Sequence, residues 1–276
     1  MKPLIIYHGN CSDGFAAVWC FWRKHLYDAD YFPGVYQSPA PSVLNRDVVM
    51  VDFSYKRETI QLMLLSAKSI TILDHHKSAM ADLAGLDHPN LSMHFDMNRS
   101  GATIAWDYLY PGEPRPALLA HVEDRDLWRF KLPLTREIHA AVTSYPFSFE
   151  QWSVLMASQE EELHSLALSG EAIERKHHKD IGELVEECKR RMVIGGYSVP
   201  VACLPGTMAS DAGHLMAQNE PFSACYYDTA DHRKFSLRSD ANGGLDVSLV
   251  AALYGGGGHA RAAGFRVPRD HDLAKG

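Results

Sequence analysis

Imidazole and carboxylate side chains follow three short apolar segments in the first third of the chain. The apolar segments cover residues 4–7, 48–51 and 70–73. The polar residues that come soon after them are His8, Asn10, Asp13, Asp52, Asp74, His75 and His76. If the segments are parallel strands, their carboxyl ends meet at one edge of a sheet, where ligands of such sheets bind. The spacing therefore predicts one cluster of histidines and aspartates.

This set of side chains favours divalent metal ions. Crowded carboxylates repel one another unless cations neutralise them, and a His/Asp set without thiolates suits Mn²⁺ or Mg²⁺. A helical stretch with Glu123, Asp124 and Asp126 can bring further carboxylates to the same edge. Two such ions about 3.5–4 Å apart activate water, orient a phosphoryl group and stabilise developing charge. These residues therefore indicate hydrolysis of phosphate esters.

Each of these residues has a structural alternative when it is taken alone. An aspartate after a strand often caps a helix, and His8 or the pair His75 and His76 could be ordinary loop residues. Three aligned strand ends make that joint coincidence the less favoured interpretation. A catalytic thiol at Cys11 is disfavoured because the sequence supplies no dedicated base for it. Other histidines are interpreted as structural or solvated, namely His25, His139, His177 and His178.

A second pattern lies near the C-terminal end, where the four glycines 255–258 precede His259 and Arg261. Glycines permit unusual backbone angles and a close approach of amide groups to an anion. We expect these glycines to serve anion binding and not packing. A predicted strand before them ends in Arg238 and Ser239, a cation and a hydroxyl. Together these residues predict a pocket for an anion or a nucleotide.

The elements that must position these residues alternate between strand and helix. Two of the three apolar segments are rich in β-branched residues, as buried parallel strands tend to be. The predicted helices of this half cover residues 13–26, 57–67, 100–109 and 118–127. This alternation predicts the α/β class, with a doubly wound parallel sheet in an N-terminal domain.

Residues 158–192 carry almost no strand signal and predict one long linker helix, with a weak point at Gly170 and a stop at Gly195–Gly196. A smaller α/β domain follows. Its predicted strands cover 199–204, 223–227 and 235–239, and its predicted helices cover 209–218 and 246–254. We therefore expect domains at 1–157 and 193–276, joined by the helix, with the active site in the cleft between them.

Composition limits the classes of function. The 276 residues are 46% hydrophobic and carry a formal net charge of −7. The hydrophobic share excludes wholesale disorder, and the charge argues against long duplex nucleic acid as a partner. The sequence shows no apolar run of the roughly 18 residues that a membrane span needs. Five cysteines without a CxxC pair favour a reducing cytoplasm. A homodimer is left open.

These residues resemble the DHH phosphoesterase family. Asp74-His75-His76 spells the family name, the stretch from His8 to Asp13 is similar to its first motif, and Asp52 to its second. The fourth motif resembles the stretch around Asp124. Residues 236–264 are similar to the DHH-associated domain. The resemblance is strongest to nano-RNases, 3′-phosphoadenosine-5′-phosphate phosphatases and dinucleotide phosphodiesterases.

The resemblance implies a role for each residue. Asp52 would bridge two metal ions, with His8 on one of them. The ligands of the other ion would be Asp13, His75 and Asp124. His76 would face the substrate phosphate, and Asp74 would orient its neighbours. The substrate-binding residues would be Arg99, Arg238, Ser239, Gly256, Gly257, Gly258 and His259.

One departure concerns the first motif, where family members carry two aspartates and this chain has only Asp13. Asn10 stands where a carboxylate is expected, and Asn10 and Asp126 are alternative ligands. A charge-poor ligand set would make one metal site the weaker of the two.

The predicted function is metal-dependent hydrolysis of a phosphodiester or phosphomonoester in a small nucleotide or short oligonucleotide, as by a 3′–5′ exonuclease of the nano-RNase kind. Two Mn²⁺ ions are the expected cofactors, with Mg²⁺ as the alternative. An exopolyphosphatase or inorganic pyrophosphatase is the second interpretation. A non-catalytic nucleotide sensor is the third.

Overall fold

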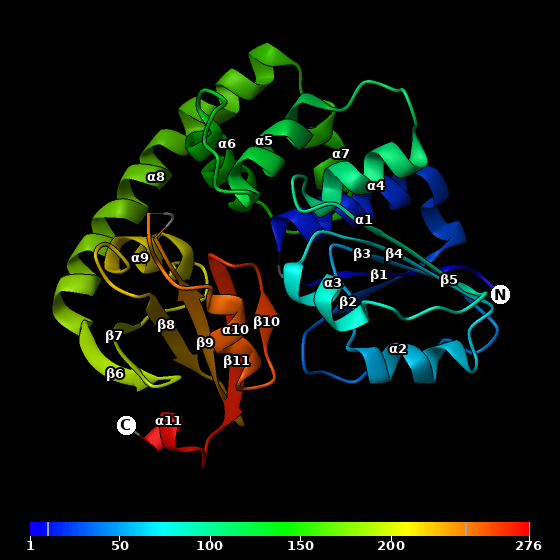
Figure 1. Ribbon diagram of the computed structural model, residues 1–276. Helices are drawn as coiled ribbons and strands as arrows, with labels where there is room; N and C mark the ends of the chain where they lie inside the picture. Colours follow the sequence, from blue (N-terminus) through cyan, green and yellow to red (C-terminus); the bar gives the residue numbers. More distant parts are fainter. Residues whose placement is uncertain (10, 241, 276) are drawn as a thin grey trace. The chain divides into compact units, whose positions relative to one another are not determined.

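A computed structural model describes residues 1–9, 11–240 and 242–275, so the prediction for Asn10 lies outside the described residues. The chain divides into two compact units, Met1–Glu174 and Arg175–Gly276 (Figure 1). We describe each unit by itself. The boundaries 1–157, 158–192 and 193–276 stay a prediction.

The first unit is built on a parallel sheet. In the described part of the chain, this sheet has the order β2-β1-β3-β4-β5. Its strands are β1 Leu4–His8, β2 Asp30–Gly34, β3 Asp47–Val51, β4 Ser69–Asp74 and β5 Leu91–Phe95. The three predicted strands are confirmed as β1, β3 and β4. The sequence did not predict β2 and β5, which form the edges of the sheet and lack a continuous buried run.

Helices cover both faces of this sheet, as a doubly wound fold requires (Figure 1). Their bounds are α1 Ser12–His25, α2 Arg57–Leu64, α3 Lys77–Leu83, α4 Gly101–Leu109, α5 Ala117–Asp126, α6 Thr135–Thr143 and α7 Phe149–Met156. Ile5, Val51 and Leu73 face α1 and α4. Ile6 and Ile72 on the other face pack with residues of α2 and α3. The α/β, doubly wound prediction is confirmed for this unit.

The long helix α8, Glu160–Cys188, differs from its prediction in two places. It continues through Gly170 without a break. A Cβ there would lie 1.8 Å from the backbone oxygen of Glu137, so the glycine permits close packing of α8 on α6. The helix also ends at Cys188, before Gly195–Gly196. These two glycines, with φ of 57° and 87°, form a hairpin turn and do not stop the helix. The sequence missed the strand β6, Arg190–Ile194, that enters this turn.

The second unit holds a mixed sheet with the order β10-β11-β9-β8-β7-β6 among the residues described. Its strands are β6 Arg190–Ile194, β7 Tyr197–Cys203, β8 Ser223–Asp228, β9 His232–Arg238, β10 Gly257–Gly258 and β11 Ala262–Pro268. Its helices after α8 are α9 Ala209–Met216, α10 Val247–Ala252 and α11 Asp272–Lys275. One hydrophobic core joins α8 and α9 to the sheet, and another joins α10 and α11 to it. The prediction of a smaller α/β unit is confirmed.

Candidate metal centre

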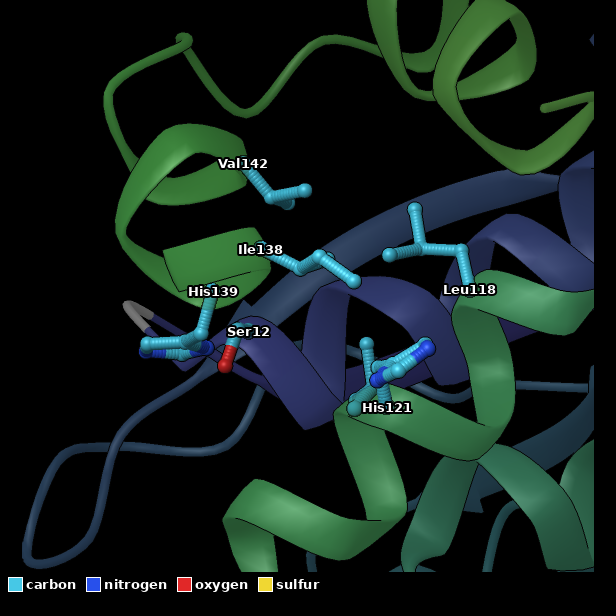
Figure 2. Close-up of a pocket in the computed structure, with 7 residues that line it drawn as sticks. Ser12, Leu118, His121, Ile138, His139 and Val142 are labelled. Carbon is cyan, nitrogen blue, oxygen red and sulfur yellow. The ribbon is translucent and has the colours of Figure 1, made fainter. Parts of the chain in front are cut away.

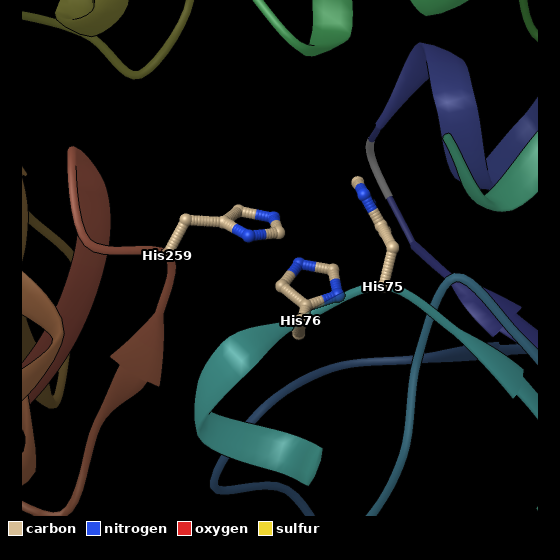
Figure 3. A group of neighbouring side chains, drawn as sticks. All are labelled: His75, His76 and His259. Atoms are coloured by element: carbon tan, nitrogen blue, oxygen red, sulfur yellow. The ribbon is translucent and has the colours of Figure 1, made fainter. Parts of the chain in front are cut away.

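The predicted cluster forms where the chain order of the parallel sheet reverses, between β1 and β3. Ligands of open parallel sheets bind at this point, outside the carboxyl ends of the strands. His8 ends β1, Asp52 follows β3, and Asp74 ends β4. His75 and His76 come next and lie beside each other at the end of β4 (Figure 3). The strand ends thus deliver the residues that the sequence singled out.

Asp52 lies at the centre of the cluster and is 1% exposed. One of its carboxylate oxygens lies 3.0 Å from Nε2 of His75, and the other lies 3.3 Å from Nδ1 of His8. Its φ of 53° is in the left-handed region, and its backbone N–H donates to the oxygen of Leu73. An unusual backbone angle held in this way is typical of functional sites. The two carboxylate oxygens therefore face different imidazoles.

Two groups of metal-ligating atoms meet at Asp52 among the described residues of the first unit. His8, Asp52 and His76 form one group, and Asp13, His75 and Asp126 form the other. Within each group the ligand atoms lie within 4.8 Å of one another. Nε2 of His75 is 3.8 Å from Asp13 Oδ2 and 3.6 Å from Asp126 Oδ2. Asp52 thus lies where the resemblance implies a bridging ligand.

The pKa values of the aspartates in the cluster reflect how closely their carboxylates are packed. Burial, and then the charge of Asp52, hold the pKa of Asp13 well above its usual range. Burial likewise raises the pKa of Asp126. Burial alone would raise the pKa of Asp52 too, but hydrogen bonds from His75 and His8 hold it well below the usual value. Several buried carboxylates share one small volume, an arrangement that a cation relieves.

The donor set fits a divalent metal ion. His8 Nδ1 and Asp52 Oδ2 are buried, and the 3.3 Å contact between them is long for a hydrogen bond. Neither atom has another partner among the residues that the structure describes, and buried polar atoms without a well-formed hydrogen bond are rare and need a reason. Imidazole nitrogens and carboxylate oxygens, with no thiolate among them, match the preferences of Mn²⁺ and related ions.

Asp74 acts on its neighbours through hydrogen bonds. Its Oδ1 accepts from the backbone N–H groups of His75 and His76, at 2.8 and 3.2 Å. The same oxygen lies 2.7 Å from Nδ1 of His76. These contacts fix the plane of the His76 ring, as expected for a carboxylate that orients a functional imidazole. That His76 faces a substrate phosphate stays a prediction.

The assignment of Asp124 as a metal ligand needs correction. Its carboxylate accepts hydrogen bonds from the backbone N–H groups of Lys131 and Leu132, at 2.9 and 3.1 Å, and from Oγ1 of Thr135 at 2.8 Å. Both oxygens therefore bind the loop after α5. The structure brings Asp126, the alternative ligand, to the cluster instead.

The first backbone amides of α4 form hydrogen bonds with Asp13 of the cluster. Asp13 accepts hydrogen bonds from the backbone N–H groups of Gly101 (2.6 Å) and Ala102 (3.1 Å). Ser100 caps this helix, because its Oγ accepts from the backbone N–H of Thr103 at 3.3 Å. The sequence did not single out Gly101, because its importance depends on long-range contacts.

Arg99, a predicted substrate ligand, is directed to α4. Its guanidinium lies 2.9 Å from the carboxylate of Asp107 and also donates to the backbone oxygen of Thr103. That Arg99 binds the substrate stays a prediction.

We expect Gly101→Ala to disturb the cluster directly. A Cβ at this position would lie 2.4 Å from the Cβ of Asp52 and 2.8 Å from its Cα. Overpacking of this kind lowers the free energy of unfolding by about 1–3 kcal/mol, and it should also weaken Mn²⁺ binding by displacing Asp52. Thermal denaturation and Mn²⁺ titration of the purified variant measure both effects.

Gly182→Ala is the matched control for this substitution. Gly182 lies within α8, and no heavy atom lies within 4 Å of its added Cβ. The control should stabilise the protein by about 0.5–1 kcal/mol, since alanine favours helix. If Gly101→Ala behaved like this control and bound Mn²⁺ normally, the close approach of α4 to Asp52 would not be needed for stability or for metal binding.

Tyr36 is a second residue that the sequence did not reveal. Its ring contacts those of His8 and His76 edge-on, with centroids 5.3 and 6.0 Å apart, and it packs against Phe53 at 4.8 Å. Tyr36 follows β2, the unpredicted edge strand, so no sequence signal marked it. These contacts restrict the orientation of both imidazoles.

The glycines of the second unit make close backbone contacts, while the predicted substrate binding by Gly257 and Gly258 stays a prediction. A Cβ on Gly256 would lie 2.1 Å from the backbone oxygen of Gly264. The N–H groups of Gly255 and Gly256 donate to backbone oxygens of α10, and Gly257 and Gly258 pair with β11. Their conformations thus close α10 onto the sheet, so the amides at 255 and 256 do not form an anion cradle.

The other predicted residues of this unit lie on neighbouring segments of the mixed sheet. Arg238 ends β9 and donates to Oγ of Ser210 at 2.7 Å. Ser239 is buried and donates to the backbone oxygen of Ala260. His259 follows β10, and its N–H donates to the oxygen of Ala262. Their contact with a substrate stays a prediction.

A small pocket in the first unit lies apart from the predicted ligands. Figure 2 shows its lining, which comprises Ser12, Leu118, His121, Val122, Ile138, His139 and Val142. Burial lowers the pKa of His121, whose Nδ1 lies 2.9 Å from Oγ1 of Thr135. The aliphatic side chains of this lining, which come from α5 and α6, are typical of a packing defect in a helical layer.

Comparison with known proteins gives a distant sequence relative. No family model matches the chain. The chain is 31% identical over 286 aligned residues to the uncharacterized protein R106 of Acanthamoeba polyphaga mimivirus. The alignment covers 95% of this chain and 66% of that protein, so the chain spans slightly less than two thirds of the relative's length.

Solved structures define the fold. The DHH domain of a member of the S1p family of ribosomal proteins matches with a TM-score of 0.58 and 14% identity, covering 97% of this chain and 83% of that one. The pGpG-specific phosphodiesterase PggH from Vibrio cholerae matches with a TM-score of 0.47 and 16% identity, over 100% and 96% of the two chains. RecJ with Mn²⁺ from Thermus thermophilus gives 0.49 and 15%, over 96% and 49%.

The first of these likenesses, together with the parallel sheet and the Asp74-His75-His76 motif at the end of β4, identifies the fold. The chain has the DHH phosphoesterase fold.

Proposed function

We propose that this protein is a metal-dependent phosphoesterase that hydrolyses small nucleotides or short oligonucleotides. The observation that carries the proposal is the position of buried Asp52, which belongs to one group of ligand atoms and reaches the other through His75. One of its carboxylate oxygens faces His75 and the other faces His8. The DHH phosphoesterase fold supports it. Two Mn²⁺ ions are the proposed cofactors, since imidazole ligands favour Mn²⁺ over Mg²⁺.

Different residues would have different roles in such a site. His8, Asp13, Asp52, His75 and Asp126 would hold the ions. Bound divalent ions supply an activated water and neutralise charge on the phosphoryl oxygens. Asp74 holds the His76 ring in place, and Asp13 ties the cluster to the start of α4. These contacts fix the ligands before substrate arrives, as an efficient site requires.

The charge of the chain supports a short substrate. With a net charge of −7 and no run of Lys or Arg longer than the three residues 189–191, counterion release can contribute little affinity for long strands. Binding must then come from a site that holds only a few nucleotides. No helix in the part of the chain that the structure describes is long and apolar enough to cross a membrane. A cytoplasmic location stays a prediction.

A substrate panel with Mn²⁺ tests this proposal. The panel comprises 3′-phosphoadenosine-5′-phosphate, a diadenylate, RNA and DNA oligomers of increasing length, tripolyphosphate and pyrophosphate. We expect turnover of the dinucleotide, and a steep fall in activity beyond about five nucleotides, a length set by a single small pocket.

Three other outcomes of the panel would contradict the proposal. Processive degradation of long single strands at physiological salt would contradict the expected length dependence. Turnover confined to tripolyphosphate or pyrophosphate would replace the nucleotide with an inorganic substrate. Nucleotide binding without any hydrolysis would indicate a sensor.

A further inference from the structure

The loop at residues 127–134, directly after α5, has a strained backbone. Trp128, Phe130 and Leu134 have φ of 55°, 48° and 61°. Side chains other than glycine adopt this region rarely, and bulky ones more rarely still. Such conformations persist only where the surrounding structure imposes them, and they gather at functional sites.

Asp124 imposes this conformation. Its backbone oxygen accepts from the N–H groups of Arg129 and Phe130, at 2.8 and 3.4 Å. Its carboxylate accepts from the N–H groups of Lys131 and Leu132. Four consecutive amides of the loop therefore bind one buried residue. The loop is fixed, and its side chains are presented in one arrangement.

Four side chains in and beside this loop form what we call the Arg–aromatic cluster, namely Arg125, Trp128, Phe130 and Arg136. The rings of Trp128 and Phe130 meet edge-on, with centroids 5.0 Å apart. The guanidinium of Arg125 lies 4.2 Å from the Trp128 ring centroid, and that of Arg136 lies 3.6 Å from the Phe130 ring centroid. Arg136 is also 3.8 Å from Glu174. All four members of the cluster are partly exposed.

The Arg–aromatic cluster adjoins the candidate metal centre. Asp126 belongs to the ligand group with Asp13 and His75. Trp128 follows it by two residues, so their Cα atoms are at most about 7 Å apart. Although burial raises the pKa of Asp126 overall, Arg125 is close enough to lower that pKa through its charge. The cluster and this ligand group both belong to the first unit.

We infer that the Arg–aromatic cluster binds the nucleobase of the nucleotide whose phosphate occupies the candidate metal centre. Aromatic rings and guanidinium planes stack on any base, because every base has a π-face. The two guanidiniums also offset the repulsion between a phosphate and the clustered aspartates. The inference rests on the proposed function and narrows its substrate class to nucleotides. The first unit alone would then distinguish a nucleotide from an inorganic polyphosphate.

The test compares two ligands that differ only in the base. Isothermal titration of the full-length protein with Mn²⁺ gives Kd values for adenosine 5′-monophosphate and ribose 5-phosphate. Stacking of one base changes affinity by about 5- to 100-fold, so the wild-type protein should bind the nucleotide tighter by such a factor. Trp128→Leu should bring the ratio of the two Kd values close to one. Trp128→Phe keeps a ring and should retain most of the ratio.

Tyr108→Leu is the matched control, because Tyr108 is an exposed aromatic residue of α4 that is not part of the cluster. This variant should keep the wild-type ratio. A wild-type ratio near one would overturn the inference whether or not the Trp128 variants fold. A large ratio that survives Trp128→Leu would also overturn it, because the base would then be recognised elsewhere.

The hydrolysis assay separates this inference from the proposed function. Phosphoester hydrolysis with a wild-type ratio near one would refute the inference alone. A large ratio that depends on Trp128, in a protein that hydrolyses no phosphoester, would support base binding and refute the proposed function.

Discussion

Replacing Asp52 by asparagine is expected to lower phosphoester hydrolysis by about 10³-fold or more. The carboxylate lies between the imidazoles of His8 and His75 and is the proposed bridge between two ions. Its charge would stabilise both, and the loss of about 4 kcal/mol of transition-state stabilisation corresponds to this factor. Asparagine tolerates the left-handed backbone of this position, so the fold should survive.

Turnover of a dinucleotide at saturating Mn²⁺ and the thermal midpoint of unfolding measure the two parts of this prediction. Asp87→Asn, which removes an exposed carboxylate that belongs to neither ligand group, is the control and should change neither. Asp52→Asn activity within about tenfold of the wild type would contradict a bridging role.

The second large effect separates Asp126 from Asp124. Asp126→Asn should lower hydrolysis by about 10²-fold or more, because it removes a charged ligand of the group with Asp13 and His75. Burial already raises the pKa of Asp126, so loss of this charge should not lower the thermal midpoint of the metal-free protein. Turnover and thermal denaturation of the same preparation show both effects.

Asp124→Asn should lower the stability of the protein and leave metal binding almost unchanged. Its amide would place a donor against the backbone N–H groups of Lys131 or Leu132. An unsatisfied buried donor costs about 1–3 kcal/mol, so the thermal midpoint should fall while Mn²⁺ affinity changes little. If Asp124→Asn abolished Mn²⁺ binding and Asp126→Asn did not, the ligand assignment from the structure would be wrong.

The site residues at the strand ends could be predicted from the sequence, because each of them lies next to its strand along the chain. Each of His8, Asp52 and Asp74 follows a buried apolar segment, and parallel strands necessarily bring such positions to one edge. The family resemblance added their implied roles. The fold class followed from the same alternation of strands and helices.

The choice between Asp124 and Asp126 could not be made from sequence. Two residues apart on a helix, their side chains point about 200° from each other, so only one can face the sheet. Which one does so depends on how α5 docks and on the loop after it, which binds Asp124 through Lys131 and Leu132. Neither feature has a local signature.

The roles of several glycines could not be predicted from the sequence for a related reason. The run 255–258 suggested amides open to an anion, and Gly170 suggested a helix break. Both permit a close approach between segments distant in sequence, Gly256 to Gly264 and Gly170 to Glu137. A glycine marks a backbone without a side chain, but the sequence does not say which neighbour occupies the space.

The most direct test of the central claim is electron paramagnetic resonance of metal-free protein loaded with Mn²⁺. A pair of ions bridged by Asp52 is spin-coupled, so the wild type with two equivalents of Mn²⁺ should give a multiline spectrum of coupled ions. Asp52→Asn should give only the six-line spectrum of isolated Mn²⁺. A wild-type spectrum that stays uncoupled at every loading would contradict the account, since Asp52 would then join no pair of metal ions.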